Sequence, residues 1–439
     1  MYTSGSEISS RAGGAFMYKK ISGLFIMVLV LVALFATADR AMADTEFDFY
    51  YQRIEKVVQI NNPEPKGWWE KTKAFVKSGV NAVKRTWENA VTRNYNLGEG
   101  SKRWYSGEDH NIAYDVKRVK VKSEAHLLEL MGVKDEAELT DGQKALLAVY
   151  RHSTSDNIKD RMKYSYRNKI NVILSDTTGF DDPGKYPHVT RDFWPYSSGA
   201  TIQMSSGRYN WPGSESSARS TFVHEFAHSF DRTIKEFIKP YGKDGSHFAN
   251  ELTKPRTAFV EGWAEFNEML DSADKVRQMN NTVDLIKIED KKKAGEYTNV
   301  EPDTLTGKQL LSVEGINAII LHRIATEVKG GKDKVFKAFT STGWKLFRDL
   351  STITKQLCRQ NPDDIAAIAR IIDERTLGKL SDKEFMQYIG SSAAAREFLK
   401  NRKKAVEEAV EASAGTVEAT GKPLDIEVKT DGASPFGVK

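Results

Sequence analysis

The chain has 439 residues, of which 40% are hydrophobic and 28% are charged, with 31 glycines, 12 prolines and one cysteine. This globular composition excludes collagen-like, low-complexity and wholly disordered chains, and the lone Cys358 excludes a disulfide scaffold and a multi-cysteine metal site. The net charge of +5 comes from 65 basic and 60 acidic residues, a balance that predicts no nucleic-acid partner. The function must therefore depend on a local site.

The amino terminus has the pattern of a secretory signal peptide. A Lys-Lys pair precedes an apolar run over residues 21–36, and an A-x-A site ends at Ala43. We therefore expect residues 1–43 to be cleaved and the mature chain to be exported, as a periplasmic or secreted protein; Met17 is an alternative start of translation. The competing interpretation is an uncleaved membrane anchor, because the run approaches the roughly 17 residues that span a bilayer.

Residues 44–109 are expected to form a basic, helical N-terminal extension. From Phe47 to Arg93 apolar residues recur at gaps of mostly three, four and seven, which indicates one apolar helix face. Basic side chains cover residues 66–93, so this segment is a candidate for peripheral contact with an anionic membrane. The favoured interpretation is a helix packed on the main domain with a solvated basic face. The stretch from Gly98 to Asp109 is the expected boundary.

Residues 110–300 mix strand and helix patterns and are expected to form the catalytic domain. Short strands are predicted at residues 114–121, 169–174 and 200–204. Thr140-x-x-Gln143 predicts a helix start, and a turn-rich stretch covers residues 184–195.

From about Leu305 the pattern is helical, which predicts a helical C-terminal subdomain over residues 301–398 and a solvated tail over residues 399–439. Ser381-x-x-Glu384 is another helix start, whereas the EF-hand-like frame from Asp373 to Glu384 lacks two calcium ligands. Cys358 and His322 are expected to be packed and inert. The expected fold class is α+β, a small mixed sheet and a motif-bearing helix followed by a mostly helical half.

The informative motif is HEFAH at residues 224–228, an HExxH match. Residues four apart lie one turn apart on one helix face, so His224 and His228 can bind one Zn²⁺ per chain. Glu225 lies beside them, placed to take a proton from metal-bound water. Asp231 follows on the same face, where it could orient an imidazole N–H.

A catalytic zinc usually has three protein ligands and one open position. Ile234 stands where the extended metzincin motif has a third histidine, so the third ligand must lie downstream. Glu261 and Glu265 are four residues apart on an expected helix, so one can bind the metal while the other braces a histidine. Glu314 is a rival, and the spacing favours Glu261.

HEFAHSFD followed by VEGWAEF resembles the catalytic core of gluzincin zinc metallopeptidases, in the group with HExxHxxD and a later E-x-x-A-E that includes anthrax lethal factor and MtfA-type peptidases. The resemblance covers residues 170–270 and is specific at these two motifs. It implies a zincin-like domain with His224, His228 and Glu261 as zinc ligands. It also implies that Glu225 is the general base and that Asp231 lies behind the ligands. Such enzymes keep an edge strand before this helix, so the resemblance further implies that the strand predicted at residues 200–204 is an edge with which an extended peptide could pair.

The sequence departs from that group in one respect. Lethal-factor-like peptidases place a tyrosine shortly before the third ligand to stabilise the oxyanion, and residues 250–260 contain none. Tyr241, His247 and Arg256 are the available substitutes. The sequence thus predicts an exported zinc endopeptidase that acts on a protein or peptide; the alternative is an inactive zincin-like binding or scaffold protein.

Overall fold

The computed structural model describes part of the chain. The described residues are 46–59, 99–106, 112–165, 169–176, 188–191, 199–230, 248–290, 293, 295–342 and 349–420. The expected signal peptide and the basic segment 66–93 lie outside these ranges. None of the helices within them has the length and apolar character needed to cross a lipid bilayer.

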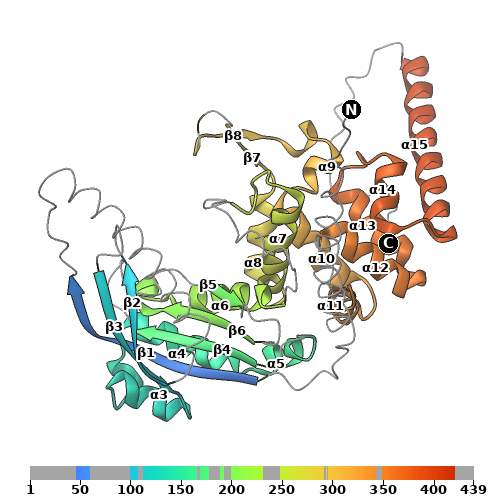
Figure 1. The fold of residues 1–439 in the computed structure, drawn as a ribbon. Coiled ribbons are helices and arrows are strands. Elements are labelled where there is room, and N and C mark those ends of the chain that lie inside the picture. The colour runs from blue at the N-terminus through green and yellow to red at the C-terminus, as the bar shows by residue number, and fades with distance from the viewer. Residues whose placement is uncertain are drawn as a thin grey trace, which may run out of the picture. The chain divides into compact units, whose positions relative to one another are not determined.

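Six strands of the described residues form one mixed sheet in the order β2-β3-β1-β4-β6-β5 (Figure 1). The strands are β1 (Glu46–Gln59), β2 (Gly100–Ser106), β3 (Ile112–Lys120), β4 (Lys169–Asp176), β5 (His188–Arg191) and β6 (Gly199–Ser205). β4 runs parallel to both β1 and β6, whereas β2–β3, β3–β1 and β5–β6 are antiparallel pairs. The strands predicted at residues 114–121, 169–174 and 200–204 are confirmed, and the fold is α+β.

The helix predicted from Phe47 is wrong over its first part, which is strand β1. Residues 46–53 of β1 pair with β4, and residues 50–59 pair with β3. Residues 50–53 therefore have a strand on each side that satisfies their backbone groups, and the aromatic and β-branched residues of this segment favour the extended conformation. β2 likewise occupies the expected linker, so the boundary expected at residue 109 falls inside the sheet.

The helices next to the sheet are α3 (Glu124–Met131), α4 (Asp141–Ser153), α5 (Asp156–Met162) and α6 (Glu215–His228). The predicted start of α4 is confirmed, because Thr140 and Gln143 form a reciprocal capping box. α4 and α6 pack against each other and contact the sheet. The ring of Phe47 on β1 lies 5.9 Å from that of Phe222 and 5.7 Å from that of Phe226, both on α6. α6, which carries the HExxH motif, is thus fixed on the sheet by its aromatic face.

The chain continues into α7 (Pro255–Met269), α8 (Ala273–Thr282), the hairpin β7 (Ile286–Glu289) and β8 (Tyr297–Val300), α9 (Gly307–Leu310) and α10 (Glu314–Glu327). α7 and α10 approach each other at Gly262. A Cβ atom at this position would lie 2.6 Å from the backbone oxygen of Glu314 and 2.7 Å from Cβ of Asn317. Only glycine therefore allows the two backbones to come this close.

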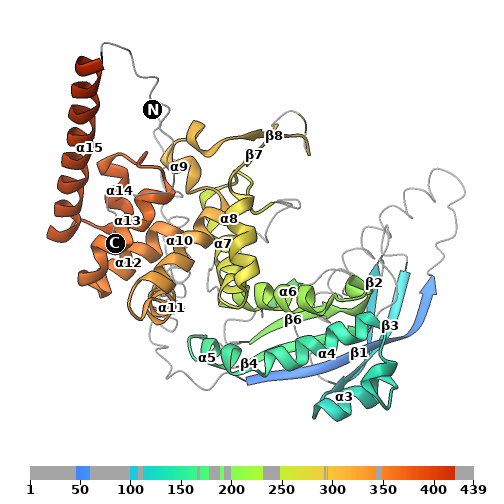
Figure 2. The ribbon, with the colours of Figure 1, turned by 180° about the vertical axis from the view of Figure 1, so that it is seen from behind.

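The remaining helices are α11 (Gly331–Ser341), α12 (Leu350–Gln360), α13 (Ile365–Arg375), α14 (Asp382–Ile389) and α15 (Ala393–Thr420). Short 3-10 turns lie at Glu136–Glu138, Ser206–Tyr209, Pro302–Thr304 and Pro362–Asp364. Figure 2 shows α12, α13 and α14 together, with α15 alongside. The helical pattern predicted from residue 301 is confirmed, as is the Ser381–Glu384 capping box.

Two features of this C-terminal part differ from the expectation. α15 runs past residue 398 to Thr420, through the start of the expected tail, where Lys–Glu pairs four residues apart support a solvated helix. A single cluster of buried apolar side chains extends from Phe49 to Leu399, so the boundary expected at residue 300 falls inside this core. Cys358 is buried in that core, and burial raises the pKa of its thiol to about 12, in agreement with a packed, inert cysteine.

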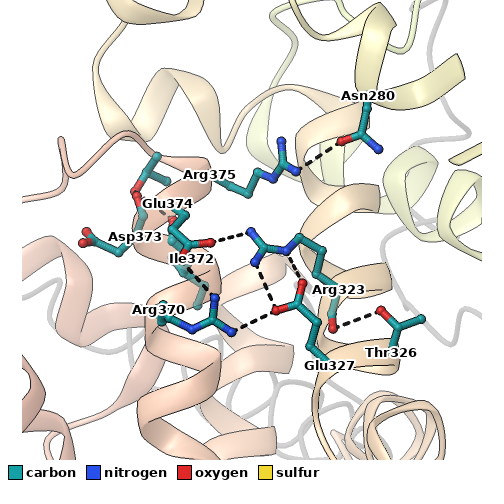
Figure 3. Close-up of polar contacts among 10 residues, drawn as sticks. Asn280, Arg323, Thr326, Glu327, Arg370, Ile372, Asp373, Glu374 and Arg375 are labelled. Carbon is teal, nitrogen blue, oxygen red and sulfur yellow. Dashed lines mark hydrogen bonds and ion pairs between the residues drawn. The ribbon is translucent and has the colours of Figure 1, made fainter. Parts of the chain in front are cut away.

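An ion-pair network joins α10 to α13 (Figure 3). Arg323 binds Glu327 on its own helix and lies 2.7 Å from Glu374, while Arg370 lies 2.9 Å from Glu327 and 3.0 Å from Glu374. Each carboxylate therefore bridges two guanidinium groups. Arg375, in the last turn of α13, extends the contacts to Asn280 of α8 at 3.2 Å.

Replacement of Glu374 by Gln should lower the free energy of unfolding by about 1 kcal/mol at pH 7, an effect that disappears in acid. Burial raises the pKa of Glu374, but its hydrogen bonds with Arg323 and Arg370 outweigh burial and hold the pKa below its ordinary value. This stabilisation is complete above the unfolded pKa, about 4.3, and is lost as the pH falls through the lower folded pKa. Urea unfolding of wild type and variant from pH 7 to pH 3 measures the difference. A gap that stays constant over this range would contradict the ion-pair assignment.

Candidate metal centre

Two helices bring three metal-ligand candidates together. His224 and His228 come from the last turns of α6, and Glu261 comes from the middle of α7. Nε2 of each histidine lies 3.2 Å from the same oxygen, Oε2 of Glu261. Tetrahedral zinc with bonds of about 2.0–2.1 Å places its ligand atoms roughly 3.3 Å apart. The donor set and its spacing therefore fit one zinc ion.

The packing of α7 on α6 fixes this arrangement. Trp263, two residues after Glu261, is buried, and its indole Nε1 donates a hydrogen bond of 3.2 Å to the carbonyl oxygen of Ala227. That carbonyl lies in the last turn of α6 and also accepts a hydrogen bond of 3.2 Å from the backbone N–H of Phe230. The indole ring stacks on Phe339 of α11 with centroids 3.9 Å apart. The two helices that carry the candidate ligands are thus joined one residue away from His228.

His224 has a second carboxylate partner, Glu268. Oε1 of Glu268 lies 2.9 Å from Nδ1 of His224, and Ser220 donates its hydroxyl to the other oxygen of this buried carboxylate. A proton on Nδ1, donated to Glu268, leaves Nε2 free to bind a metal.

The bracing role predicted for Glu265 is wrong, because Glu268 makes that contact and Glu265 pairs with Lys275. The two helices run antiparallel at this point: His228 faces Glu261, whereas His224 faces both Glu261 and Glu268. Glu268, one turn after Glu265 on α7, therefore reaches the imidazole of His224. Sequence spacing offered a signal, since Glu268 follows Glu261 by seven residues, two helical turns.

Charges dominate the surroundings of these residues. Burial raises the pKa of Glu261, but the two imidazoles outweigh it and hold the pKa well below its ordinary value. Burial lowers the pKa of His224, but hydrogen bonds to Glu261 and Glu268 outweigh it and raise that pKa well above its ordinary value. A proton therefore competes with a metal ion for the His224 imidazole.

The other predicted site residues are distributed as follows. Glu225 is half-buried on α6, within one turn of His228. Asp231, Tyr241 and His247 lie outside the described residues. Arg256 is half-buried in the first turn of α7. Glu314 is buried at the start of α10, and the His–His–carboxylate group found among the described residues contains Glu261 in its place.

The sequence analysis did not single out one buried tyrosine, which lies in a turn that contacts α6. Tyr209 lies in the turn before α6 and is 2% exposed. Burial raises the pKa of its hydroxyl to about 12. A hydrogen bond with Thr221 lowers this pKa, and the negative charge of Glu225 raises it further. The hydroxyl thus keeps its proton at neutral pH. No motif signals this residue, because its proximity to Glu225 depends on the turn between β6 and α6.

The edge of the sheet near α6 also differs from the expectation. The strand predicted at residues 200–204 was expected to be the edge that an extended peptide could pair with. β6 instead lies between β4 and β5, and β5 is the last strand in the order. The turn-rich composition of residues 184–195 concealed this short strand.

Comparison of the chain with protein-family models, with curated proteins and with solved structures finds no match.

Proposed function

We propose that this chain is a zinc-dependent endopeptidase with a zincin-like catalytic domain of the gluzincin type. The observation that carries the proposal is the equal 3.2 Å separation of two imidazole nitrogens from one carboxylate oxygen. Two histidines and one carboxylate form the ligand set of hydrolytic zinc sites such as that of thermolysin. We further propose that residues 1–43 direct export and that the substrate is a protein or peptide.

In this proposal His224, His228 and Glu261 hold the zinc, which supplies a Lewis acid for water and for the scissile carbonyl. Glu225 accepts the proton of the attacking water and returns it to the leaving amine. Glu268 keeps the His224 imidazole oriented through Nδ1. Tyr209, protonated and within the electrostatic influence of Glu225, is a candidate hydrogen-bond donor for the developing oxyanion.

Metal analysis of the purified protein tests the site directly. We expect about one zinc per chain in the wild type, and loss of this zinc in both His228→Ala and Glu261→Ala, because each change removes one of three ligands. Elemental analysis after dialysis against a weak chelator gives the stoichiometry.

His126→Ala on α3 is the matched control, since this histidine lies outside the ligand group, and it should keep its zinc. Zinc that survives in Glu261→Ala would transfer the third ligand to another carboxylate. A wild type that binds no zinc even after reconstitution would overturn the proposed enzyme.

A further inference from the structure

Three glutamates lie on one face of α7. Glu261, Glu265 and Glu268 follow each other at intervals of four and three residues, and their side chains are 15%, 14% and 6% exposed. Glu261 has the two imidazoles as partners, which leaves Glu265 and Glu268 as a neighbouring carboxylate pair. Two buried carboxylates repel each other strongly unless a cation lies between them.

That cation is the ammonium group of Lys275 on α8. Its Nζ lies 2.8 Å from Glu265 and 3.1 Å from Glu268, and its side chain is 21% exposed. Oxygen and nitrogen atoms of His224, Glu265 and Glu268 lie within 4.8 Å of one another, an arrangement that could also hold a metal ion. The ammonium group of Lys275 therefore occupies a position that would otherwise suit a free metal cation.

The backbone around Lys275 holds it in place. Ser272 caps α8 and accepts a hydrogen bond of 3.2 Å from the backbone N–H of Lys275. Asp271, in the turn between α7 and α8, forms an ion pair with the fully buried Arg161. These contacts fix the backbone of Lys275, and its side chain extends toward the carboxylates of Glu265 and Glu268 on α7.

We propose that Lys275 is a positioning residue for the metal centre. Its ammonium neutralises the Glu265–Glu268 pair and so keeps Glu268 in its hydrogen bond with Nδ1 of His224. Without this charge the repulsion from Glu265 turns the Glu268 carboxylate away from it, and the imidazole loses the acceptor that orients it. The inference rests on the proposed function, because it assigns Lys275 a part in zinc binding.

A double-mutant cycle tests this role. The variants are Lys275→Met, Glu265→Gln and the two combined, and zinc affinity is measured by competition with a chromophoric chelator. Lys275→Met should weaken zinc binding by about 10- to 100-fold, which is the usual effect of removing a residue that helps to orient a metal ligand. Glu265→Gln alone should stay near wild type, since Lys275 still neutralises Glu268. In the combined variant repulsion is relieved, so most of the lost affinity should return.

Recovery of zinc affinity in the combined variant distinguishes a positioning role of Lys275 from general damage to the fold. A purely structural lysine would leave the combined variant as weak as Lys275→Met or weaker, and that result would overturn the proposal, as would wild-type affinity in Lys275→Met. Lys293→Met is the matched control, because Lys293 is 63% exposed in its pair with Glu296, and its affinity should be unchanged. Thermal unfolding verifies that each variant is folded.

A metal-free measurement distinguishes this inference from the zinc proposal. In protein labelled with ¹⁵N-histidine, NMR should detect the Nδ1–H of His224 hydrogen-bonded to Glu268 in the wild type and the combined variant, with the signal lost in Lys275→Met. If the wild type binds no zinc, the zinc proposal fails, and this signal still tests the positioning role. Persistence of the signal in Lys275→Met would refute that role.

Discussion

Glu225→Gln should lower kcat/KM on a peptide substrate by about 10²–10⁴-fold and leave the bound zinc in place. The substituted amide keeps nearly the same shape as the carboxylate but cannot accept a proton, and the three proposed ligands are untouched. The measurement pairs hydrolysis of a fluorogenic peptide library with metal content of the same samples. An effect of this size with full zinc occupancy would assign the proton transfer to this side chain.

Glu215→Gln is the control for that experiment. Glu215 lies in the first turn of the same helix, well before the ligands, and should keep wild-type activity. Glu225→Gln with unchanged kcat/KM would contradict the assigned base. A zinc-loaded wild type that cleaves nothing in the library would instead favour the inactive binding or scaffold protein.

Arg161→Ala should lower the free energy of unfolding by about 3–5 kcal/mol. Arg161 on α5 is fully buried, pairs with Asp271 and donates a hydrogen bond of 3.0 Å to the carbonyl oxygen of Asn267. Its removal leaves the Asp271 carboxylate largely buried, with His152 at 3.4 Å as its remaining ionisable partner. Denaturant unfolding monitored by circular dichroism measures the change.

The control for this change is Lys159→Ala on the same helix. Lys159 is 63% exposed and lies 3.8 Å from a fully exposed Asp156, so its loss should cost less than about 0.5 kcal/mol. Equal effects of the two substitutions would mean that burial of the Arg161–Asp271 pair does not matter. The combination of Arg161→Ala with Asp271→Ala should cost less than the sum of the single changes, because no buried charge is then left alone.

Local patterns in the sequence predicted those parts of the fold that local interactions determine. The capping boxes at Thr140 and Ser381 were found because both partners lie within four residues. The helix carrying His224 and His228 was found because its apolar face repeats along a single segment. β1 was missed because its stability depends on pairing with β3 and β4, which lie far along the chain.

The difference between local patterns and contacts between distant segments also explains which residues of the candidate site could be predicted. Spacing alone could place Glu261 opposite two histidines, since the HExxH motif predicts that both imidazoles lie on one helix face. Spacing could not choose between Glu265 and Glu268, because the choice depends on the relative direction of α6 and α7. Lys275 and Tyr209 come from other elements, and no local pattern connects either of them with the histidines.

Gly262 links α7, which carries the proposed ligand Glu261, to the C-terminal half of the chain. It directly follows Glu261, and α10 lies so close that even a methyl group would collide with its backbone. No deformable side chain separates the two helices there, so a displacement of α10 is passed directly to the carboxylate. The position of Glu261 relative to the two histidines therefore depends on α10 as well as on α6 and α7. A shortened protein that ends near residue 300 would retain all three proposed ligands and lose the helix surface that aligns Glu261.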